Sequence, residues 1–496
     1  MTEIPKNLYR AEQVRELDRI AIEQFGIAGM TLMERAGSAA FNTLITHWPR
    51  AKRLAVVCGA GNNGGDGFVI ARLADAAGLR VMVYLLGERG KLKGDALTAF
   101  ERLEGSHVNI YQYDSHTFEM YDVVVDAMLG TGAQGEVKEQ WASAIERINA
   151  ARQQGTRVLA VDIPSGLHAD SGRVLGGAVQ ADVTVTFIGM KQGLLTAYGP
   201  DYCGEIVFNA LQVPEEVYAS QRPYSQRLEA EDFRRFFTQR APSTHKGQCG
   251  YVLLVGGNVG TSGAIRMASE AAAHSGAGLV SVATHPEHAA LINITRPELM
   301  CHGINDKADL LPLLDKADVV ALGPGLGQDE WAQMLFTTVM QSNLPLIVDA
   351  DGLNLLAAQP QARGNWVLTP HPGEAARLLN GSTADIQNDR FYAAEQICER
   401  YGAITVLKGC GSLICDGSGQ IALCDAGNPG MASGGMGDVL TGIIAALAGQ
   451  FGDLADAARA GVYVHARAAD LASANGERGL LAGDLFAHIR PLINYS

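Results

Sequence analysis

Residues 53–78 read RLAVVCGAGNNGGDGFVIARLADAAG, and this stretch decides how the first half of the chain is interpreted. The apolar run at its start predicts a buried strand, and the run that begins at Phe68 has the period of a helix. Five glycines lie in the loop between them. A strand, a glycine-rich loop and a helix in this order predict an α/β unit that can cradle a pyrophosphate.

This loop is compatible with two kinds of ligand. Residues 59–64 fit the dinucleotide fingerprint G-x-G-x-x-G, and Glu88 follows the next predicted strand, where an acid would bind a ribose. That pattern favours a dehydrogenase. Asn62, Asn63 and Asp66, however, add side-chain oxygens and amides that suit a hard cation or a polar substrate. Both interpretations stay open at this point.

Two further strand ends carry an aspartate. Asp126 lies in VDAMLGTG (125–132), and Asp162 lies in VDIPSG (161–166). Either side chain could merely cap the structure that follows it. Because the carboxyl ends of parallel strands meet at one edge of a sheet, we expect both to converge with Asn63, which favours a chemical role.

The whole chain has the pattern of two α/β domains. Its 496 residues exceed the length at which single cores stop growing, and both halves alternate β-branched runs with Ala- and Leu-rich stretches. The segment 211–234 loses this periodicity. We therefore predict an N-terminal Rossmann-like three-layer domain (1–218), a linker (219–227) and a C-terminal α/β domain (228–496), each with a mainly parallel sheet.

Composition narrows the possible partners. The net charge of -14 and the lack of a long basic run argue against nucleic acid, and the eight scattered cysteines form no C-x-x-C pair, which argues against a zinc site or disulfide framework. No stretch approaches the roughly 20 apolar residues of a membrane span, and the first residues lack a signal-peptide core. We expect a cytoplasmic protein that forms a homo-oligomer.

The second half contains GNPGMASGGMGD (427–438), followed by the apolar run VLTGIIAALAG. Glycines let backbone amides face an anion, and a helix N-terminus behind them adds favourable charge. Asp438 could then accept a proton from a substrate hydroxyl, although it could also be only a helix cap. KGCGS (408–412) is a second glycine-rich turn able to hold a phosphate or adenosine. This combination predicts phosphoryl transfer.

The first half resembles the NAD(P)H-hydrate epimerase family in NNGGDG, VDAMLGTG, VDIPSG and LDRIAIEQFGIAGMTLMERAG (17–37). The resemblance implies a potassium ion held by Asn63, Asp126 and Ser165. It also implies substrate contacts at Asn62, Asn63, Gly64, Gly65, Asp66, Gly130, Thr131, Gly132, Ala133, Gln134, Gly135 and Glu136, together with Asp162. Proton transfer needs positioned groups of tunable pKa, for which Asp162 is the first candidate and Lys191 the second.

The second half resembles ribokinase-like proteins, and specifically the ADP- or ATP-dependent NAD(P)H-hydrate dehydratases, in GPGLG (323–327), DADGLN (349–354) and TPHPGE (369–374). The resemblance implies a nucleotide at Lys408, Gly409, Cys410, Gly411, Ser412 and Gly437, and substrate near Ala264, Gly327, His371 and Asp438. Magnesium should accompany the nucleotide, with Glu374 as a candidate ligand.

Together these resemblances predict a repair enzyme for hydrated nicotinamide cofactors. The first domain would interconvert the R and S hydrates of NADH and NADPH, and the second would dehydrate the S form after phosphorylating its hydroxyl, with ADP preferred by resemblance alone. Two alternatives remain. A kinase of a small alcohol could be fused to a dinucleotide-binding domain, or the first half could be a non-enzymatic binding module.

Overall fold

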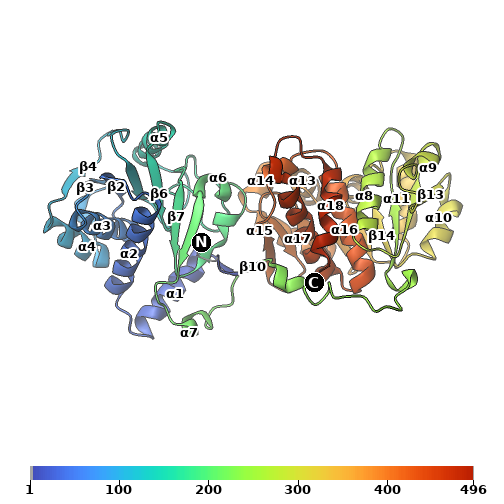
Figure 1. The fold of residues 1–496 in the computed structure, drawn as a ribbon, viewed down its shortest axis with the longest axis horizontal. Coiled ribbons are helices and arrows are strands. Elements are labelled where there is room, and N and C mark those ends of the chain that lie inside the picture. Colours follow the sequence, from blue (N-terminus) through green and yellow to red (C-terminus); the bar gives the residue numbers. More distant parts are fainter. Residues whose placement is uncertain (1–3, 495–496) are drawn as a thin grey trace. The chain divides into compact units, whose positions relative to one another are not determined.

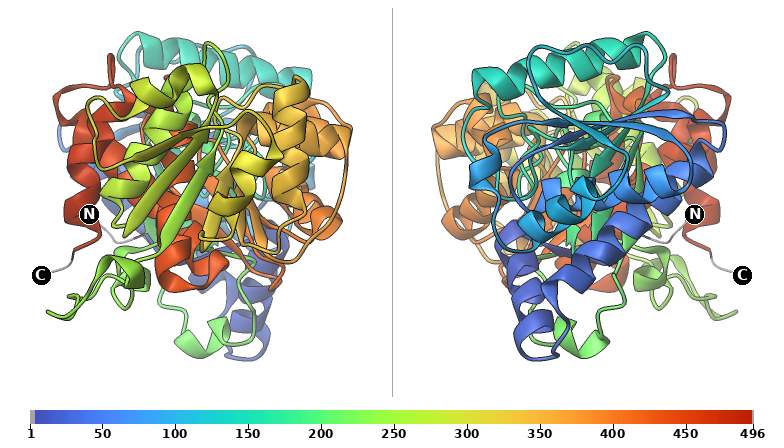
Figure 2. Two further views of the ribbon diagram at one scale, coloured as in Figure 1. Left: turned by 90° about the vertical axis from the view of Figure 1, so that its right-hand side faces the viewer. Right: turned by 90° about the vertical axis from the view of Figure 1, so that its left-hand side faces the viewer.

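The computed structural model describes residues 4–494, and the chain divides into two compact units between Ser225 and Gln226 (Figure 1). The division falls within the segment 219–227 that the sequence analysis assigned to a linker. Each unit consists of a mainly parallel sheet with helices on both faces, as Figures 1 and 2 show, so the predicted α/β class is confirmed. No helix in the described part of the chain is long and apolar enough to cross a membrane.

Unit 1 is built on seven parallel strands in the order β4-β3-β2-β5-β6-β7-β9. The strands are β2 (Arg53–Cys58), β3 (Arg80–Leu85), β4 (Asn109–Gln112), β5 (Val123–Ala127), β6 (Arg157–Val161), β7 (Val183–Phe187) and β9 (Glu205–Asn209). The chain adds strands in one direction from β2 and in the other from β5. Ligands bind at such a switch point in open α/β sheets, beyond the carboxyl ends of the strands.

Helices cover both faces of this sheet and make the predicted three layers. They are α1 (Ala11–Glu23), α2 (Gly29–His47), α3 (Asn62–Ala76), α4 (Gly94–Glu104), α5 (Glu139–Gln153), α6 (Gly199–Cys203) and α7 (Glu215–Tyr218), with 3₁₀ turns η1 (Arg89–Lys91) and η2 (Gln192–Leu195). Strand β2 shows why both faces need a cover. Leu54 and Val56 pack into the core under α1 to α4, whereas Ala55 and Val57 pack into the core that includes α5.

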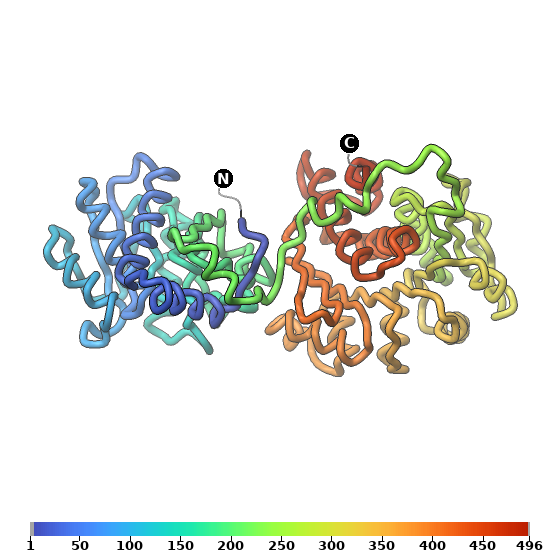
Figure 3. The backbone as a smooth tube through the Cα atoms, turned by 90° about the horizontal axis from the view of Figure 1, so that it is seen from below, coloured from blue at the N-terminus to red at the C-terminus, as the bar shows by residue number. Residues whose placement is uncertain are grey.

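A short strand pair lies beside the main sheet of unit 1. Strand β1 (Asn7–Tyr9) pairs in parallel with β8 (Met190–Lys191), so that Tyr9 lies opposite Lys191. The two strands come from the first and last parts of the unit, which the tube in Figure 3 lets the reader follow by colour. This pairing fixes the backbone from which the Lys191 side chain extends.

Unit 2 has nine strands in the order β13-β12-β11-β14-β15-β16-β17-β18-β19, and only β18 and β19 are antiparallel to their neighbours. The strands are β11 (Tyr251–Val255), β12 (Leu279–Thr284), β13 (Met300–Gly303), β14 (Val319–Leu322), β15 (Leu346–Val348), β16 (Trp366–Leu368), β17 (Ile404–Leu407), β18 (Ser412–Cys415) and β19 (Ile421–Cys424). Strand β10 (Ser225–Arg227) lies at the division between the units. A second switch point therefore lies between β11 and β14.

The helices of unit 2 pack on this sheet around one buried helix, α16 (Met436–Phe451). The others are α8 (Ser262–His274), α9 (Pro286–Ile292), α10 (Lys307–Leu314), α11 (Glu330–Met340), α12 (Ala350–Ala358), α13 (Pro372–Leu379), α14 (Thr383–Asn388), α15 (Arg390–Tyr401), α17 (Leu454–Ala472) and α18 (Phe486–Leu492). Short 3₁₀ turns are η3 (Ala230–Phe233), η4 (Lys246–Gln248), η5 (Pro429–Met431), η6 (Ser473–Asn475) and η7 (Ala482–Leu485). The apolar run after Asp438 thus forms a core helix.

Candidate active sites

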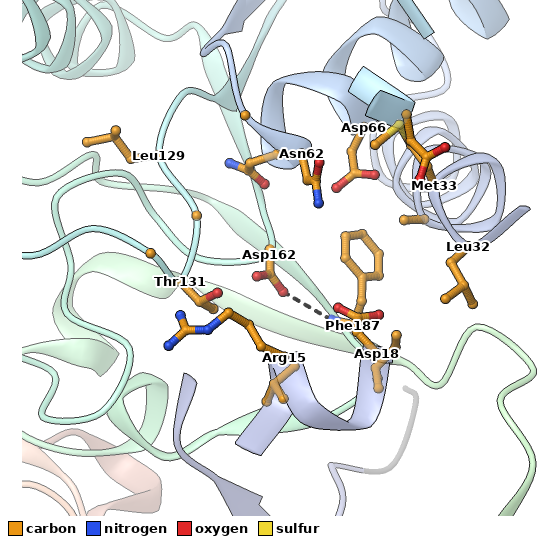
Figure 4. A pocket seen from close by; sticks show the side chains of 18 of the residues that line it. Arg15, Asp18, Leu32, Met33, Asn62, Asp66, Leu129, Thr131, Asp162 and Phe187 are labelled. Atoms are coloured by element: carbon orange, nitrogen blue, oxygen red, sulfur yellow. Dashed lines mark hydrogen bonds between the residues drawn. The ribbon is translucent and has the colours of Figure 1, made fainter. Parts of the chain in front are cut away.

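A cavity of about 540 Å³ opens at the switch point of unit 1 (Figure 4). Its walls come from α1, α2, the start of α3, and the loops that follow β5 and β6. In Figure 4 the carboxylates of Asp66 and Asp162 point into the same space, with the ring of Phe187 beside them. The cavity therefore gathers polar groups from segments that are far apart in the sequence.

The glycine-rich loop brings the start of α3 against the end of β2. A side chain at Gly64 is excluded because its Cβ would lie 1.9 Å from the carbonyl oxygen of Gly59. Gly64 is buried in this contact and Gly65 is buried against Met33 of α2. Neither glycine lines the cavity, whereas Asn62, Asn63 and Asp66 do. The two glycines therefore allow close packing, and the polar side chains on either side of them face the open space. A contact of Gly64 or Gly65 with substrate stays a prediction.

Asp126 and Ser165 form a buried oxygen cluster at the ends of β5 and β6. The backbone amide of Ser165 donates to Asp126 Oδ2 at 2.7 Å, and Ser165 Oγ donates to Oδ1 at 2.6 Å. Burial raises the pKa of Asp126 to about 6, against the lowering effect of these hydrogen bonds. Both polar atoms of the Asn63 amide are buried and have no hydrogen-bond partner among the described residues. A buried amide in this state needs a partner that the described residues do not supply, such as a water molecule or an ion.

Asp162 and Lys191 form an ion pair at the floor of the cavity. Lys191 is 1% exposed, and its ammonium group donates to Asp162 Oδ1, to Thr186 Oγ1 at 3.1 Å and to the carbonyl oxygen of Phe187 at 2.9 Å. Asp162 has a φ of +67°, an uncommon value for a residue other than glycine. This backbone conformation turns the carboxylate of Asp162 toward the cavity from the end of β6 (Figure 4).

Helix α1 contributes to this cavity, which the sequence motifs did not predict. Arg15 and Asp18 both line it, and burial raises the pKa of Asp18 to about 6, opposed by the nearby Lys191 and reinforced by Asp162. Burial, with the charges of Asp162 and Asp18, also raises the pKa of Asp66 well above its usual range. A signal was present, because Asp18 interrupts the apolar face that Val14, Leu17 and Ala21 give to this helix.

The loop after β5 reaches the cavity only with its first part. Gly130, Thr131, Gly132 and Ala133 line the cavity, and the position of Gly130 lies against the Asn63 side chain. Gln134, Gly135 and Glu136 are exposed and lie outside the lining. Their contact with substrate stays a prediction.

Unit 2 places an ion pair at the carboxyl edge of its sheet. Lys408, directly after β17, donates through Nζ to Asp349 Oδ1 at 2.7 Å, and Glu374 Oε2 lies 3.9 Å from the same ammonium group. Thr441 of α16 donates to the other oxygen of Asp349 at 2.8 Å. Asp349 is 1% exposed. Its carboxylate is thus fully paired by two residues of unit 2.

Asp438 lies in the first turn of α16, beside this ion pair. Burial and the neighbouring Asp349 raise its pKa to about 7, while Lys408 opposes that rise. A Cβ at Gly437 would lie 3.2 Å from Lys408 Nζ, so the absence of a side chain lets the helix start approach the lysine. A carboxylate with a pKa near neutrality is suited to accept a proton.

His371 and Glu374 lie at the start of α13, where they cap the helix. Glu374 accepts from the backbone amide of His371 at 2.8 Å, and the amide of Gly373 donates to His371 Nδ1 at 2.9 Å. Burial raises the pKa of Glu374 to about 7, with Lys408 opposing. The predicted substrate residue and the candidate magnesium ligand thus share a local structural role.

The remaining predicted residues lie at the switch point and beside Lys408. Gly327 follows β14, has a φ of +76°, and donates its amide to Asp351 at 2.9 Å, while Ala264 lies in the first turn of α8. Gly409 and Cys410 are exposed, Ser412 is partly exposed and Gly411 is buried. Residues 408–412, which we call the nucleotide loop after the ligand predicted for them, therefore present backbone at the surface near Asp438.

Comparison with known proteins finds a family match for each unit and full-length relatives for the whole chain. Residues 29–193 match the family model of the YjeF-related protein N-terminus, and residues 252–491 match that of NAD(P)H-hydrate dehydratase. The bifunctional NAD(P)H-hydrate repair enzyme Nnr of Coxiella burnetii is 50% identical over 98% of this chain and 99% of its own length. The Escherichia coli relative of the same name is 43% identical over 99% of this chain and 95% of its own. Among solved structures, a ribokinase-like superfamily protein from Enterococcus faecalis has a TM-score of 0.51 at 30% identity, covering 55% of this chain and 96% of that one.

Proposed function

The chain belongs to the family of bifunctional NAD(P)H-hydrate repair enzymes, and on this premise we propose how its residues carry out the two reactions. Unit 1 interconverts the R and S hydrates of NADH and NADPH. Unit 2 uses ADP, in preference to ATP, to return the S hydrate to NADH or NADPH. The family assignment predicted from the sequence motifs is confirmed, and it removes the dehydrogenase, small-alcohol kinase and binding-module alternatives.

In unit 2, we propose that Asp438 is the base that removes the proton from the substrate hydroxyl. The hydroxyl oxygen then attacks the terminal phosphorus of ADP, the bond from that phosphorus to the bridging oxygen breaks, and AMP departs. A phosphate ester is thereby formed on the ring carbon. Electrons from the ring nitrogen expel this phosphate, and loss of a neighbouring ring proton restores the double bond. Phosphate is a far better leaving group than hydroxide, which explains the need for a nucleotide.

Lys408 and the glycine-rich start of α16 would stabilise the charge that develops on the phosphoryl group. The ammonium group of Lys408 is held by Asp349 at 2.7 Å and lies beside Gly437. Backbone amides at a helix start add further stabilisation without reorganising during the reaction. Magnesium, when bound with the nucleotide, would neutralise phosphate charge. Glu374 has its carboxylate near Lys408 and could contribute to that site.

In unit 1, we propose that Asp162 and Lys191 mediate the loss and return of the hydroxyl. A proton delivered to that oxygen lets it leave as water, while the ring nitrogen forms a double bond to the carbon. Water that returns to the opposite face gives the other epimer and releases a proton. Among residues 4–494, the donors to the Asp162 carboxylate are Thr186 Oγ1, the amide of Phe187 and Lys191 Nζ, and all of them reach Oδ1. Oδ2 is then available to accept or give a proton in the cavity.

The oxygen cluster beside this pair fits a potassium ion. The amide oxygen of Asn63 is buried without a partner, and the Asp126 carboxylate is held by donors but by no cation among the described residues. Oxygen ligands of this kind suit a hard cation. We propose that Asn63, Asp126 and Ser165 hold the ion, which would orient the loop that carries Gly130. A cytoplasmic location and a homo-oligomeric state remain predictions from the sequence.

The observation that carries this proposal is the position of Asp438, half-buried beside Lys408 at the start of a glycine-preceded helix. The test follows absorbance at the reduced-nicotinamide band as mixed hydrate epimers react with magnesium and either ADP or ATP. Complete nucleotide-dependent recovery, faster with ADP, is the expected result. Recovery of only half the substrate would rule out the epimerase role of unit 1. No recovery with either nucleotide would rule out the dehydratase role of unit 2.

A further inference from the structure

Arg390, the first residue of α15, is a buried cation without an acidic partner. Its side chain is 1% exposed, and no carboxylate of the described residues lies within 4 Å of it. Burying a guanidinium group is costly unless it is paired, and proteins usually bury arginine against a carboxylate. Burial lowers the pKa of Arg390 to about 10, so the group still carries its charge at neutral pH.

The guanidinium group instead binds the back of the nucleotide loop. Nη2 donates to the carbonyl oxygens of Leu407 at 3.4 Å and Gly411 at 3.2 Å, and Nη1 donates to that of Lys408 at 3.4 Å. Nη1 also donates to the side chain of Gln387 at 3.3 Å, and Nε has no partner among residues 4–494. All these partners are neutral acceptors, so the positive charge is solvated by dipoles only.

These contacts determine which way the loop's amides point. Because a trans peptide unit is planar, the N–H of Gly409 points away from the carbonyl of Lys408, and therefore away from Arg390. Gly409 lies close to the guanidinium group, since a Cβ there would be 2.6 Å from Nη1, and its φ is +140°. The amide of Gly409 thus points to the outer side of the loop, and the charged guanidinium group of Arg390 lies on the inner side.

We infer that Arg390 is a positioning residue for nucleotide binding, which orients the nucleotide loop and supplies a buried positive charge matched to a phosphate group bound at its outer side. The inference rests on the proposed nucleotide site and deepens it. A purely structural arginine would be expected to pair with an acid. Here the nucleotide phosphate would be the missing anion, so the ligands favoured are nucleoside mono- and diphosphates over the uncharged nucleoside.

The experiment compares calorimetric binding of ADP, AMP and adenosine to the full chain and to Arg390→Gln, Arg390→Lys and Arg400→Gln. Arg400 is an exposed arginine of the same helix and serves as the matched control. We expect Arg390→Gln to weaken ADP and AMP binding at least tenfold and adenosine binding less than twofold. Arg390→Lys should recover part of the loss, and the control should bind as the wild type does.

Equal losses for adenosine and ADP, or no loss for either, would overturn the inference, as would a lysine variant no better than glutamine. Should Arg390→Gln fail to fold, Gly409→Ala tests the same contact, because the new Cβ pushes the loop from the guanidinium group, and the same selective loss is expected. Epimerase activity of each variant reports that unit 1 is intact. A wild-type chain that binds no ADP would instead overturn the proposed function, and this inference with it.

Discussion

Asp126 of unit 1 and Asp349 of unit 2 occupy the same kind of position and are treated differently. Each is a fully buried aspartate at the carboxyl edge of a parallel sheet. Asp349 is neutralised from within by Lys408 at 2.7 Å, and Thr441 donates a hydrogen bond to its other oxygen. Asp126 accepts only from Ser165 and from the backbone amide of Met128, so its charge is unmatched by any cation of the described chain.

The difference indicates that the site of unit 1, and not that of unit 2, depends on an ion from solution. A buried carboxylate without a cation has a raised pKa, as Asp126 does at about 6, and an added ion would restore the balance. Unit 2 carries its own cation as a lysine side chain. We therefore expect the activity of unit 1 to depend on the cation in solution, and the stability of unit 2 to depend on Lys408.

The largest effect is expected from Asp438→Asn, which removes the proposed base of unit 2 and leaves unit 1 untouched. Dehydration should fall about 10³-fold, within the range for loss of a general base. Epimerisation, followed by chromatographic separation of the two hydrates, should keep its wild-type rate. Asp315→Asn, at an exposed acid of the same unit, is the control. A residual dehydration rate above about a tenth of wild type would assign the base elsewhere.

Lys408→Met should be the next largest, because it leaves Asp349 buried and unpaired. Breaking one side of a buried ion pair costs about 3–5 kcal/mol, so the free energy of unfolding of unit 2 should fall by about that amount. Its urea transition should move to a lower concentration. Lys316→Met, at an exposed lysine, is the control. The transition of unit 1 should stay where it is. An unchanged transition for unit 2 would mean that Asp349 is neutralised by something other than this lysine.

Replacing potassium with choline at equal ionic strength should slow epimerisation about 10- to 100-fold and leave ADP-dependent dehydration of pure S hydrate unchanged. The magnitude is that expected when the orientation of a site around a metal is lost. Asn63→Leu should reproduce the loss in the presence of potassium. An epimerase indifferent to both changes would show that the unpartnered amide has another purpose.

Dehydration should fall about tenfold for each pH unit below about 7. The pKa of Asp438 is raised to about 7, so lowering the pH protonates the proposed base, while raising the pH leaves it ionised and the rate level. The kcat for dehydration, measured from pH 5 to 9 at saturating nucleotide, gives the profile. A midpoint near the ordinary aspartate value would contradict the influence of Asp349 and burial.

The smallest effect is expected for Thr441→Val, which removes one hydrogen bond to Asp349 and keeps the shape of the side chain. The free energy of unfolding of unit 2 should fall by about 1–2 kcal/mol, since the bond lost is to a charged group that keeps its lysine. Chemical denaturation measures the change. A loss as large as that of Lys408→Met would show that the hydroxyl, and not the ammonium group, is the main partner.

Local patterns in the sequence were enough to predict the strands, the glycine-rich turns and the aspartates at strand ends. Short apolar runs, such as those before Asp126 and Asp162, indicate both that a strand is present and where it ends. The family motifs supplied the rest of the functional prediction. Asp18 was missed because its helix is separated in the sequence by many residues from the other segments that line the cavity. Periodicity indicates that one face of the helix is buried, but it does not identify the residues that this face contacts.

Other residues were seen but their surroundings could not be predicted. Glu374 has the chemistry of a metal ligand, yet its first partner is the backbone of its own helix start, which a single sequence leaves undetermined. Arg390 reads as an ordinary surface residue at a helix start, and only the fold reveals that it lies beneath the loop of Lys408. The surroundings of Glu374 and Arg390 are set by the folded structure, and no local sequence pattern predicts them.

The pairing of β1 with β8 has a consequence for synthesis of the protein. Tyr9 leaves the ribosome early, but its partner Lys191 follows only after most of unit 1 has been translated. At elongation speeds of about 5–20 residues per second, the nascent chain waits on the order of ten seconds or more before the lysine can reach Asp162. A purification tag fused directly to the first strand would intrude on this late step, so tags belong at the other terminus.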